Sequence, residues 1–359
     1  MIVWVPLRSD GKEQEDSVLE RSETVHFVES ILEWEEKYLS PYAAKARQSR
    51  GRVYPEEPST YSTCFQQDRE RIVHSKAFRR LKSKTQVFIS PAGDHYRTRL
   101  THVLEVTQIA RSVARALRLN EDLTEAIALG HDLGHTPFGH AGEAALQRLV
   151  GHFRHNEHSL RVVDVLEEYS PDYPGLNLTW EVRDGILHHT GDTLPQTLEG
   201  QVVRFCDRIA YLNHDVEDAV RGGLLREDDL PEQVLEVLGR TSRTRIHTMV
   251  TDILHTSYGK NLVAMSPLVQ ETTDLLRQFL FDNIYLNSAA KQEESKVYGV
   301  ISMLYNYYLE HGERFRQAPD PQVEVVDYIA GMTDSFAARE FQRLFLPRGW
   351  GGDGDRSLF

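Results

Sequence analysis

The chain has 359 residues, 40% of them hydrophobic and 26% charged, which is an ordinary composition for a globular protein with a sizeable core. No apolar run approaches the ~20 residues of a membrane span, no signal peptide opens the chain, and two cysteines cannot form a disulfide framework. We therefore expect a cytoplasmic protein without membrane contact, and its net charge of −13 argues against broad, non-specific nucleic-acid binding, so an anionic ligand needs a local basic patch.

The N-terminal part of the chain contains one such patch. Residues 1–30 mix charged and apolar side chains without a persistent period, and we expect them to form an accessory extension. The segment 69–84 (RERIVHSKAFRRLKSK) is basic, and its apolar residues recur at helical spacing, which predicts an amphipathic helix. A solvated helix face is the commoner reason for such a run, but in so acidic a chain we expect phosphate contact. The basic residues are Arg69, Arg71, Lys76, Arg79, Arg80, Lys82 and Lys84.

Helical periodicity dominates the rest of the chain. Alternating, strand-like runs are scarce, and Pro and Gly lie between the periodic segments rather than inside them. We predict a mainly α fold with little or no β, in one helical domain over 31–346 that is followed by a C-terminal tail over 347–359. The clearest apolar stripes lie in 100–117, 121–134, 200–220, 267–285 and 296–315.

Four polar residues interrupt these apolar stripes. His102 and Asp207 face the packed sides of their helices, and His131 and Asp132 close the apolar run AIALG. A lone buried histidine is usually a hydrogen-bonded core residue, whereas a buried aspartate is costly unless it is paired or bound to metal. Two of each, without an obvious local partner, favour a mixed nitrogen and oxygen metal site with room for water and phosphate oxygens.

Histidines are concentrated between residues 131 and 189, where eight of the sixteen lie. Imidazoles near a metal can orient phosphates and move protons near neutral pH. His140 and Glu143 are three residues apart, which suits a proton-donating histidine that a carboxylate holds in place. The same spacing suits a surface histidine beside a glutamate at a helix start equally well.

A second polar stripe follows Asp207. Asp207, Tyr211 and Asp215 recur at i, i+4 and i+8, so they line one helix face that would suit a metal, a sugar or base ring and a sugar hydroxyl. Taken alone this pattern is weak, because a tyrosine at such a position usually belongs to the core.

With these residues assembled, the chain resembles the HD-domain superfamily of metal-dependent phosphohydrolases, whose H…HD…D signature matches His102, His131–Asp132 and Asp207. The resemblance is closest to bacterial deoxyguanosinetriphosphate triphosphohydrolase-like proteins and runs from about Glu33 to about Leu346. It implies an HD-domain helical bundle with additional C-terminal helices. Six ordered segments carry it: HSKAFRRLKSKTQVF, GDHYRTRLTHVLEVTQIAR, ALGHDLGHTPFGHAGE, HNEHSLRVV, EGQVVRFCDRIAYLNHDVEDA and VDYIAGMTDSFA.

The resemblance also implies an activity and roles for particular residues. A deoxynucleoside triphosphate would be cleaved to deoxynucleoside and inorganic tripolyphosphate. His140, backed by Glu143, matches the family's catalytic histidine, and His135 and His155 match histidines that approach the phosphates. The four implied ligands of a divalent metal ion (Mn, Mg, Fe or similar) are His102, His131, Asp132 and Asp207. The implied substrate-binding residues are Arg99 and Arg208 for the phosphates, and Gln86, Tyr211 and Asp215 for the deoxyribose.

Elementary chemistry agrees with these roles. A divalent ion polarises the α-phosphoryl group and lowers the pKa of a bound water, which gives a hydroxide for attack on the α-phosphorus. The 5′-oxygen is a poor leaving group unless it is protonated, and a histidine acid such as His140 is worth roughly 10²–10⁴ in rate. Arg99, Arg208 and Lys84 would neutralise the triphosphate, as phosphoryl transfer generally requires.

Relatives of this type form hexamers or other homo-oligomers and often bind a second deoxynucleoside triphosphate as an activator at a subunit interface, so both are expected from the resemblance. The preferred base is left open. One alternative is an HD nucleotidase or phosphodiesterase on other nucleotides, which the cations of 69–84 disfavour. Another is a non-catalytic protein that binds nucleotides or single-stranded DNA, which the intact His140 and Glu143 disfavour. Cys206 stands where the family usually has a small residue, and we expect it to be a buried packing variant.

Overall fold

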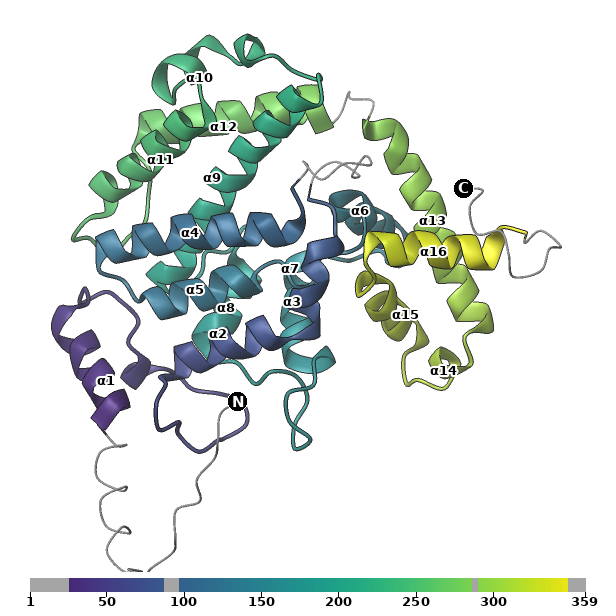
Figure 1. The fold of residues 1–359 in the computed structure, drawn as a ribbon, viewed down its shortest axis with the longest axis horizontal. Helices are drawn as coiled ribbons and strands as arrows, with labels where there is room; N and C mark the ends of the chain where they lie inside the picture. The colour runs from purple at the N-terminus through teal and green to yellow at the C-terminus, as the bar shows by residue number, and fades with distance from the viewer. Residues whose placement is uncertain (1–25, 87–96, 286–289, 348–359) are drawn as a thin grey trace, which may run out of the picture.

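The computed structural model describes residues 26–86, 97–285 and 290–347 (Figure 1). Within these ranges the chain is helical and has no strand, only the isolated bridges Thr85–Thr98 and Glu168–Gly175. The predicted mainly α fold is therefore confirmed. None of the described helices has the length and apolarity that crossing a bilayer requires.

The helices follow one another along the whole described chain. In order they are α1 (His26–Tyr38), α2 (Cys64–His74), α3 (Lys76–Arg80), α4 (Arg99–Leu117), α5 (Glu121–Gly130), α6 (Gly139–Val150), α7 (His155–Arg161), α8 (Trp180–His188), α9 (Leu198–Arg221), α10 (Glu232–Val237), α11 (Ser242–Ser257), α12 (Pro267–Leu280), α13 (Ala290–His311), α14 (Glu313–Arg316), α15 (Pro321–Ala330) and α16 (Asp334–Phe345). Short 3-10 turns lie at Ala46–Gln48, Leu81–Ser83 and Glu227–Asp229, and π turns lie at Val162–Leu166 and Phe281–Tyr285.

The basic segment is not one helix, as its periodicity had suggested. Ser75 ends α2 and begins α3, because its side chain accepts a hydrogen bond from the Phe78 amide and so favours a new helix start over continuation. At the N-terminus, α1 begins at His26, so the expected boundary of the extension at residue 30 falls inside a helix. Residues 1–25 and 348–359, which hold most of the expected extension and tail, lie outside the described residues.

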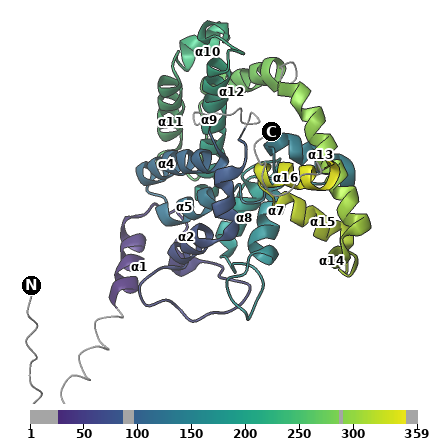
Figure 2. The same ribbon diagram turned by 45° about the vertical axis from the view of Figure 1, so that its right-hand side comes forward.

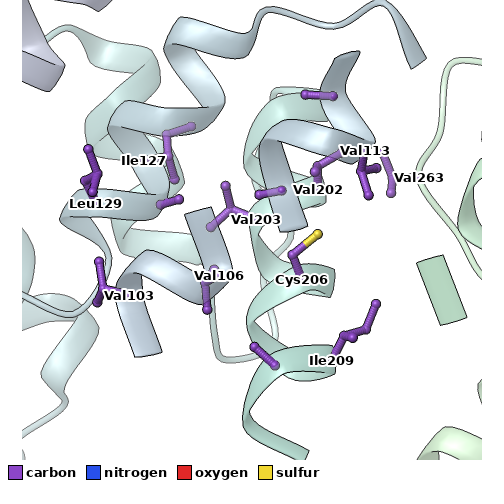
Figure 3. Packing of buried hydrophobic residues seen from close by; sticks show 14 of the residues in the cluster. Val103, Val106, Val113, Ile127, Leu129, Val202, Val203, Cys206, Ile209 and Val263 are labelled. Atoms are coloured by element: carbon purple, nitrogen blue, oxygen red, sulfur yellow. The ribbon is translucent and has the colours of Figure 1, made fainter. Parts of the chain in front are cut away.

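The larger hydrophobic core lies between α2, α4, α5, α8, α9, α11 and α12. The apolar stripe of α4 faces that of α9, and Figure 3 shows Val106 of α4 and Val203 of α9 in this packing. Cys206 is fully buried in the same cluster, which confirms the expectation that it is a packing residue. Because α4, α5 and α9 all pack here, polar residues on their buried faces converge on one another.

A second, smaller core joins the C-terminal helices to α6. It contains Leu146 of α6 and Phe153, which pack with Ile301 and Leu304 of α13 and Ile329 of α15. Figures 1 and 2 show α13 to α16 set to one side of the main helical body, with α6 beside α13. The C-terminal helices therefore pack directly on the helix that carries His140.

Candidate active site

Helices α4, α5 and α9 bring three of the predicted metal ligands into one group. His102 on α4, His131 just after α5 and Asp207 on α9 each offer a ligand atom within 4.8 Å of the others. His102 Nε2 lies 3.0 Å and His131 Nε2 lies 3.7 Å from Asp207 Oδ1. Burial by itself raises the pKa of Asp207, but the contact with His102 and the neighbouring His131 hold that pKa below its ordinary value, so the carboxylate is ionised.

The His131 imidazole is oriented to bind a cation. Its Nδ1–H donates to the Ala128 carbonyl at 2.6 Å, which leaves Nε2 of the neutral ring unprotonated. That Nε2 is buried and has no hydrogen-bond partner among the described residues. A buried lone pair of this kind is costly unless a cation binds it. The donor set therefore fits a divalent metal ion.

Asp132, the fourth predicted ligand, lies beside this group. Its Oδ1 is 3.6 Å from His131 Nε2, and its Oδ2 accepts a hydrogen bond from Arg99 Nη1 at 2.6 Å. Arg99 is only 1% exposed and also donates to the carbonyls of Thr85 and Gln86, at 3.2 Å each. Burial raises the pKa of Asp132, but His131 and Arg99 hold it well below its ordinary value. Asp132 is thus ionised and held in a fixed orientation.

The turn after α5 reverses the chain over these ligands. A side chain at Gly134 would lie 2.1 Å from the Ser159 amide nitrogen, so only glycine permits this close approach. Phe138 (φ 64°) and Gly139 (φ 58°) both adopt the left-handed conformation, which is unusual for a phenylalanine. The resulting bend starts α6 and places His140 in its first turn.

His140 and Glu143 form a pair on the outer side of the site. His140 Nδ1 lies 3.2 Å from Glu143 Oε2, and the His140 side chain is 71% exposed. Glu143 also accepts hydrogen bonds from the His155 amide at 2.8 Å and from His155 Nδ1 at 3.0 Å. Burial raises the pKa of Glu143, but the hydrogen bonds with His140 and His155 hold it below its ordinary value. One carboxylate therefore orients two imidazoles.

His135 lies between this pair and the metal-ligand group. Its Nε2 is 3.4 Å from Asp132 Oδ1, and its ring stacks on His155 with centroids 4.0 Å apart. The His140 ring is 5.2 Å away. Burial, together with Arg99 and His155, lowers the pKa of His135 well below its ordinary value, so this imidazole is neutral.

Asp334, at the start of α16, stabilises the bend between α5 and α6, although it is far from this bend in the sequence. Its Oδ1 accepts a hydrogen bond from the Phe138 amide at 2.9 Å, and its Oδ2 accepts one from the Thr85 amide at 2.9 Å and another from the Thr85 hydroxyl. These bonds join the smaller core to the strained turn before His140. Asp334 was not identified from the sequence, because it is 196 residues from Phe138 along the chain.

Lys84 supports the same bend. It is 3% exposed, and its ammonium donates to the carbonyl of His135 and, at 2.9 Å, to that of Ala330. Burial lowers the pKa of Lys84 to about 7. In this position the side chain stabilises the loop, whereas the sequence had suggested a phosphate contact.

Two arginines of the basic segment are paired within the chain, whereas Lys76, Arg79 and Lys82 are exposed. Arg69 contacts the carboxylates of Asp122 at 2.8 Å and Glu125 at 2.9 Å, and Arg71 pairs with Glu56. Acidic side chains of the same chain therefore neutralise Arg69 and Arg71, and their contact with phosphate stays a prediction.

The predicted deoxyribose residues of α9 share a face with Asp207, a predicted metal ligand. Asp207, Tyr211 and Asp215 lie at successive turns of one continuous helix, as their spacing predicts. Asp215 is 2% exposed, and Tyr211 packs partly against the larger core. Arg208 lies on another face of α9 and is 3.9 Å from Asp274.

Gln86 is the last residue of the described range 26–86. Its side chain is 7% exposed, and Oε1 has no hydrogen-bond partner within the described ranges. Its carbonyl accepts from Arg99, so Gln86 lies next to the Arg99–Asp132 pair.

One histidine of the site was not singled out from the sequence. His189 follows α8, and its Nε2 is 3.2 Å from His155 Nε2, while its ring centroid is 5.0 Å from that of His131. Burial, with the neighbouring His131 and His155, lowers the pKa of His189 to about 3. The sequence feature that could have identified His189 is the pair of adjacent histidines at 188–189 in the histidine-rich region.

The fold and the ligand group together define an HD-domain hydrolase. Residues 99–212 match the HD domain family, and residues 263–343 match the phosphohydrolase-associated domain family. HD domains bind a divalent metal ion, in agreement with the ligand group.

Relatives that match most of the chain identify a family within this class of hydrolases. A protein of Caldanaerobacter subterraneus subsp. tengcongensis is 56% identical over 89% of this chain and 95% of its own. Proteins of Desulfatibacillum aliphaticivorans (47% identical, 86% and 95% covered) and Clostridium perfringens strain 13 (46% identical, 89% and 98% covered) are also similar. All three are named deoxyguanosinetriphosphate triphosphohydrolase-like protein, and the chain belongs to this family.

Proposed function

We propose that this protein hydrolyses deoxynucleoside triphosphates to deoxynucleosides and inorganic tripolyphosphate. The observation that carries the proposal is the position of the exposed His140, held by Glu143, beside the group of His102, His131 and Asp207 that could hold a metal ion. His135 lies between the two, with Nε2 3.4 Å from Asp132 Oδ1 and its ring 5.2 Å from that of His140. The name that the relatives share supports a triphosphate as the substrate.

The metal would be held by His102, His131, Asp132 and Asp207. When bound, a divalent ion supplies Lewis-acid polarisation of a phosphoryl oxygen and lowers the pKa of a water molecule. Mixed imidazole and carboxylate donors suit Mn²⁺ or Fe²⁺ better than Ca²⁺, which prefers oxygen ligands alone.

His140 would act as the general acid. Water adds to the α-phosphorus, the bond from phosphorus to the 5′-oxygen breaks, and that oxygen takes a proton from His140. Glu143 holds Nδ1 of the ring, so Nε2 is left to face the substrate, and the exposure of the side chain leaves room for one. A general acid at this step contributes roughly 10²–10⁴ in rate.

The remaining predicted residues would bind the substrate. The Oε1 atom of Gln86 and the carboxylate of Asp215 suit the 3′-hydroxyl of a deoxyribose, and Tyr211 would crowd the 2′ position. We assign Lys84 to support of the loop rather than to the substrate. The phosphate-binding residues of the proposal are Arg99, His135, His155 and Arg208.

Product analysis tests the proposal. The metal-loaded protein is incubated with each of the four deoxynucleoside triphosphates, singly and mixed, and the products are separated by chromatography. We expect deoxynucleoside and tripolyphosphate from the wild type and none from His131→Ala. The variant His152→Ala removes an exposed histidine paired with Glu157 at 2.6 Å, and it should keep full activity.

Each alternative function has its own outcome in this experiment. A nucleoside monophosphate with pyrophosphate would support a nucleotidase or phosphodiesterase instead. Nucleotide binding without any product would support the non-catalytic binding protein.

A further inference from the structure

A cleft lies between the main helical body and the C-terminal helices. Its volume is about 510 Å³, which is enough for a small organic molecule. The end of α3, the turn after α5 and the π turn after α7 contribute to one side of it, and α14, α15 and α16 contribute to the other. The described residues that line it include none of the predicted metal ligands or substrate-binding residues. The proposed reaction therefore gives this cleft no role.

Three guanidinium groups from different helices line the cleft. They belong to Arg80 of α3, Arg314 of α14 and Arg339 of α16. Within the described ranges Arg314 and Arg339 form no ion pair, and Arg80 has only a long one, with Nη2 3.7 Å from Glu167 Oε1. Such a group of cations is unusual in a chain whose net charge is −13.

Two carboxylates also line the cleft, but one of them is already neutralised. Asp327 accepts hydrogen bonds from Arg161, with Nη2 2.6 Å from Oδ2 and Nε 2.8 Å from Oδ1, and His158 Nε2 lies 3.2 Å from the same Oδ1. The other carboxylate belongs to Glu324, which is exposed. Three guanidinium groups against one remaining carboxylate give the lining a positive charge, which favours an anionic ligand.

Arg80 points to a ligand for a second reason. Its Nε is buried and has no hydrogen-bond acceptor among the described residues. Burial lowers the pKa of the Arg80 guanidinium, and Glu167 only partly opposes this effect. A buried donor without an acceptor costs free energy, and an anion bound beside the guanidinium would offset the cost of burying its charge.

The rest of the lining is largely apolar. Leu133 and Met332 are 2% and 3% exposed, and the ring of Phe336 is half-buried beside them in the cleft. The Thr333 hydroxyl already accepts a hydrogen bond from the amide of Phe336, and both ring nitrogens of His158 face partners in the chain. This lining offers few free side-chain groups to a nucleobase or a sugar, and it suits an apolar ring or chain instead.

We propose that this cleft binds a small organic phosphate, whose phosphate group contacts Arg80, Arg314 and Arg339 and whose apolar part packs on the apolar lining. Guanidinium groups bind phosphate through paired, charge-assisted hydrogen bonds, and three of them suit a phosphate dianion better than a carboxylate. The cleft is separate from the candidate active site, so the proposal does not depend on which reaction the protein catalyses.

A ligand in the cleft would contact both sides of the bend between α5 and α6. Leu133 directly follows Asp132, and the turn between α15 and α16 leads into Asp334, whose carboxylate accepts from the Phe138 amide at 2.9 Å. Binding would therefore join this turn to the bend and oppose its local opening. Amide hydrogen exchange over residues 133–139 should slow when the ligand is bound.

Phenyl phosphate is the probe that tests the proposal. Isothermal titration calorimetry measures its binding to the metal-loaded and the metal-stripped protein, in parallel with inorganic phosphate and phenol. We expect saturable binding of phenyl phosphate that persists after metal removal. Its affinity should be at least about tenfold higher than that of either partial probe, because each lacks the phosphate group or the ring.

The two ends of α16 provide a matched pair of variants. Arg339→Ala removes an exposed guanidinium from the cleft and should not disturb folding, and it should weaken phenyl phosphate binding by about tenfold or more. Arg80→Gln should have the same effect, with circular dichroism as the check of its fold. Arg343→Ala, one turn further along α16, removes an arginine that pairs with Glu340 at 2.8 Å outside the cleft, so it should bind like the wild type.

Three results would overturn the proposal. The first is the absence of saturable phenyl phosphate binding. The second is binding that disappears with the metal or that persists unchanged in Arg339→Ala and Arg80→Gln, which would place the phosphate outside this cleft. The third is an equal affinity for inorganic phosphate or for phenol, which would contradict an organic phosphate as the ligand.

Discussion

The guanidinium of Arg99 and the carboxylate of Asp132 form an ion pair of 2.6 Å whose side chains are 2% and 4% exposed. Arg99 begins the helix that carries His102, and Asp132 follows His131, so the pair joins two elements that carry predicted metal ligands. Arg99 occupies Oδ2 of Asp132 and leaves Oδ1 toward His131 and His135. The orientation of Asp132 thus depends on the guanidinium of Arg99.

Loss of this pair should destabilise the protein strongly. Arg99→Met keeps most of the side-chain volume but leaves a buried carboxylate uncompensated, which costs about 3–5 kcal/mol in unfolding free energy. Urea denaturation of the metal-free protein measures this change. Arg115→Met, which removes an exposed pair with Glu121, should leave the unfolding free energy nearly unchanged. Equal losses in the two variants would contradict the assignment of Arg99.

Glu143→Gln tests the orientation of the catalytic pair. The amide keeps the size of the side chain but not the charge that holds His140 and His155, so the turnover number should fall by roughly 10²–10⁴. Steady-state kinetics measure the loss. Glu157→Gln, in the exposed pair with His152, should behave like the wild type. A Glu143→Gln enzyme with normal turnover would remove the pair from the mechanism.

Asp334→Ala tests the support given by the C-terminal helices. Loss of its hydrogen bonds leaves the amides of Thr85 and Phe138 without their acceptor, so we expect a stability loss of about 1–3 kcal/mol. Turnover should also fall, on the order of 10–100-fold, because the bend before His140 loosens. Asp320→Ala removes only the N-terminal cap of α15 and should cost about 1 kcal/mol without loss of turnover. Parallel thermal unfolding and kinetics separate the two effects.

Glu199 should make stability depend on pH. Its Oε1 accepts from the amides of Ala44 and Asn120, but burial raises its pKa from 4.5 to about 7. Between these two values the folded protein keeps a proton that the unfolded chain has released, so the contribution of Glu199 is present at low pH and lost as pH rises to 7. The wild type should lose about 3 kcal/mol of unfolding free energy relative to Glu199→Gln between pH 4 and pH 9. The exposed Glu236, changed to Gln, should give a difference that is flat across this range.

Metal removal should lower the melting temperature. A ligand at a hundred times its dissociation constant stabilises the folded state by about 2.7 kcal/mol, so Mn²⁺ should raise the melting temperature of the stripped wild type by several degrees. Differential scanning calorimetry measures the shift. His131→Ala should show little of it, whereas His152→Ala should show all of it. A full shift in His131→Ala would place the metal elsewhere.

Hydrophobic periodicity predicted well the helices that form the larger core. The stripe in 100–117 became α4, and that in 200–220 became α9, because each apolar face has a facing helix in the larger core. Polar residues on those faces, such as His102 and Asp207, were predicted to meet and do meet. A charged residue on an otherwise apolar helix face can be recognised directly from the sequence.

Other parts of the site depend on contacts that no local pattern encodes. Asp334 and Ala330 reach the bend from the far end of the chain, and the partners of Arg69 were not visible in its own segment. The orientation of His189 depends on the hydrogen bond from its Nδ1 to the Ile186 carbonyl, which the turn after α8 places. Runs of charged residues therefore predicted the site less well than isolated polar residues on packed helix faces did.

The central claim is the position of bond cleavage, and isotope labelling tests it most directly. The metal-loaded protein hydrolyses a deoxynucleoside triphosphate in water enriched in oxygen-18, and mass spectrometry locates the label. The account predicts unlabelled deoxynucleoside and a tripolyphosphate that carries one labelled oxygen on a terminal phosphoryl group. Label in a nucleoside monophosphate, in pyrophosphate or in the deoxynucleoside itself would contradict it.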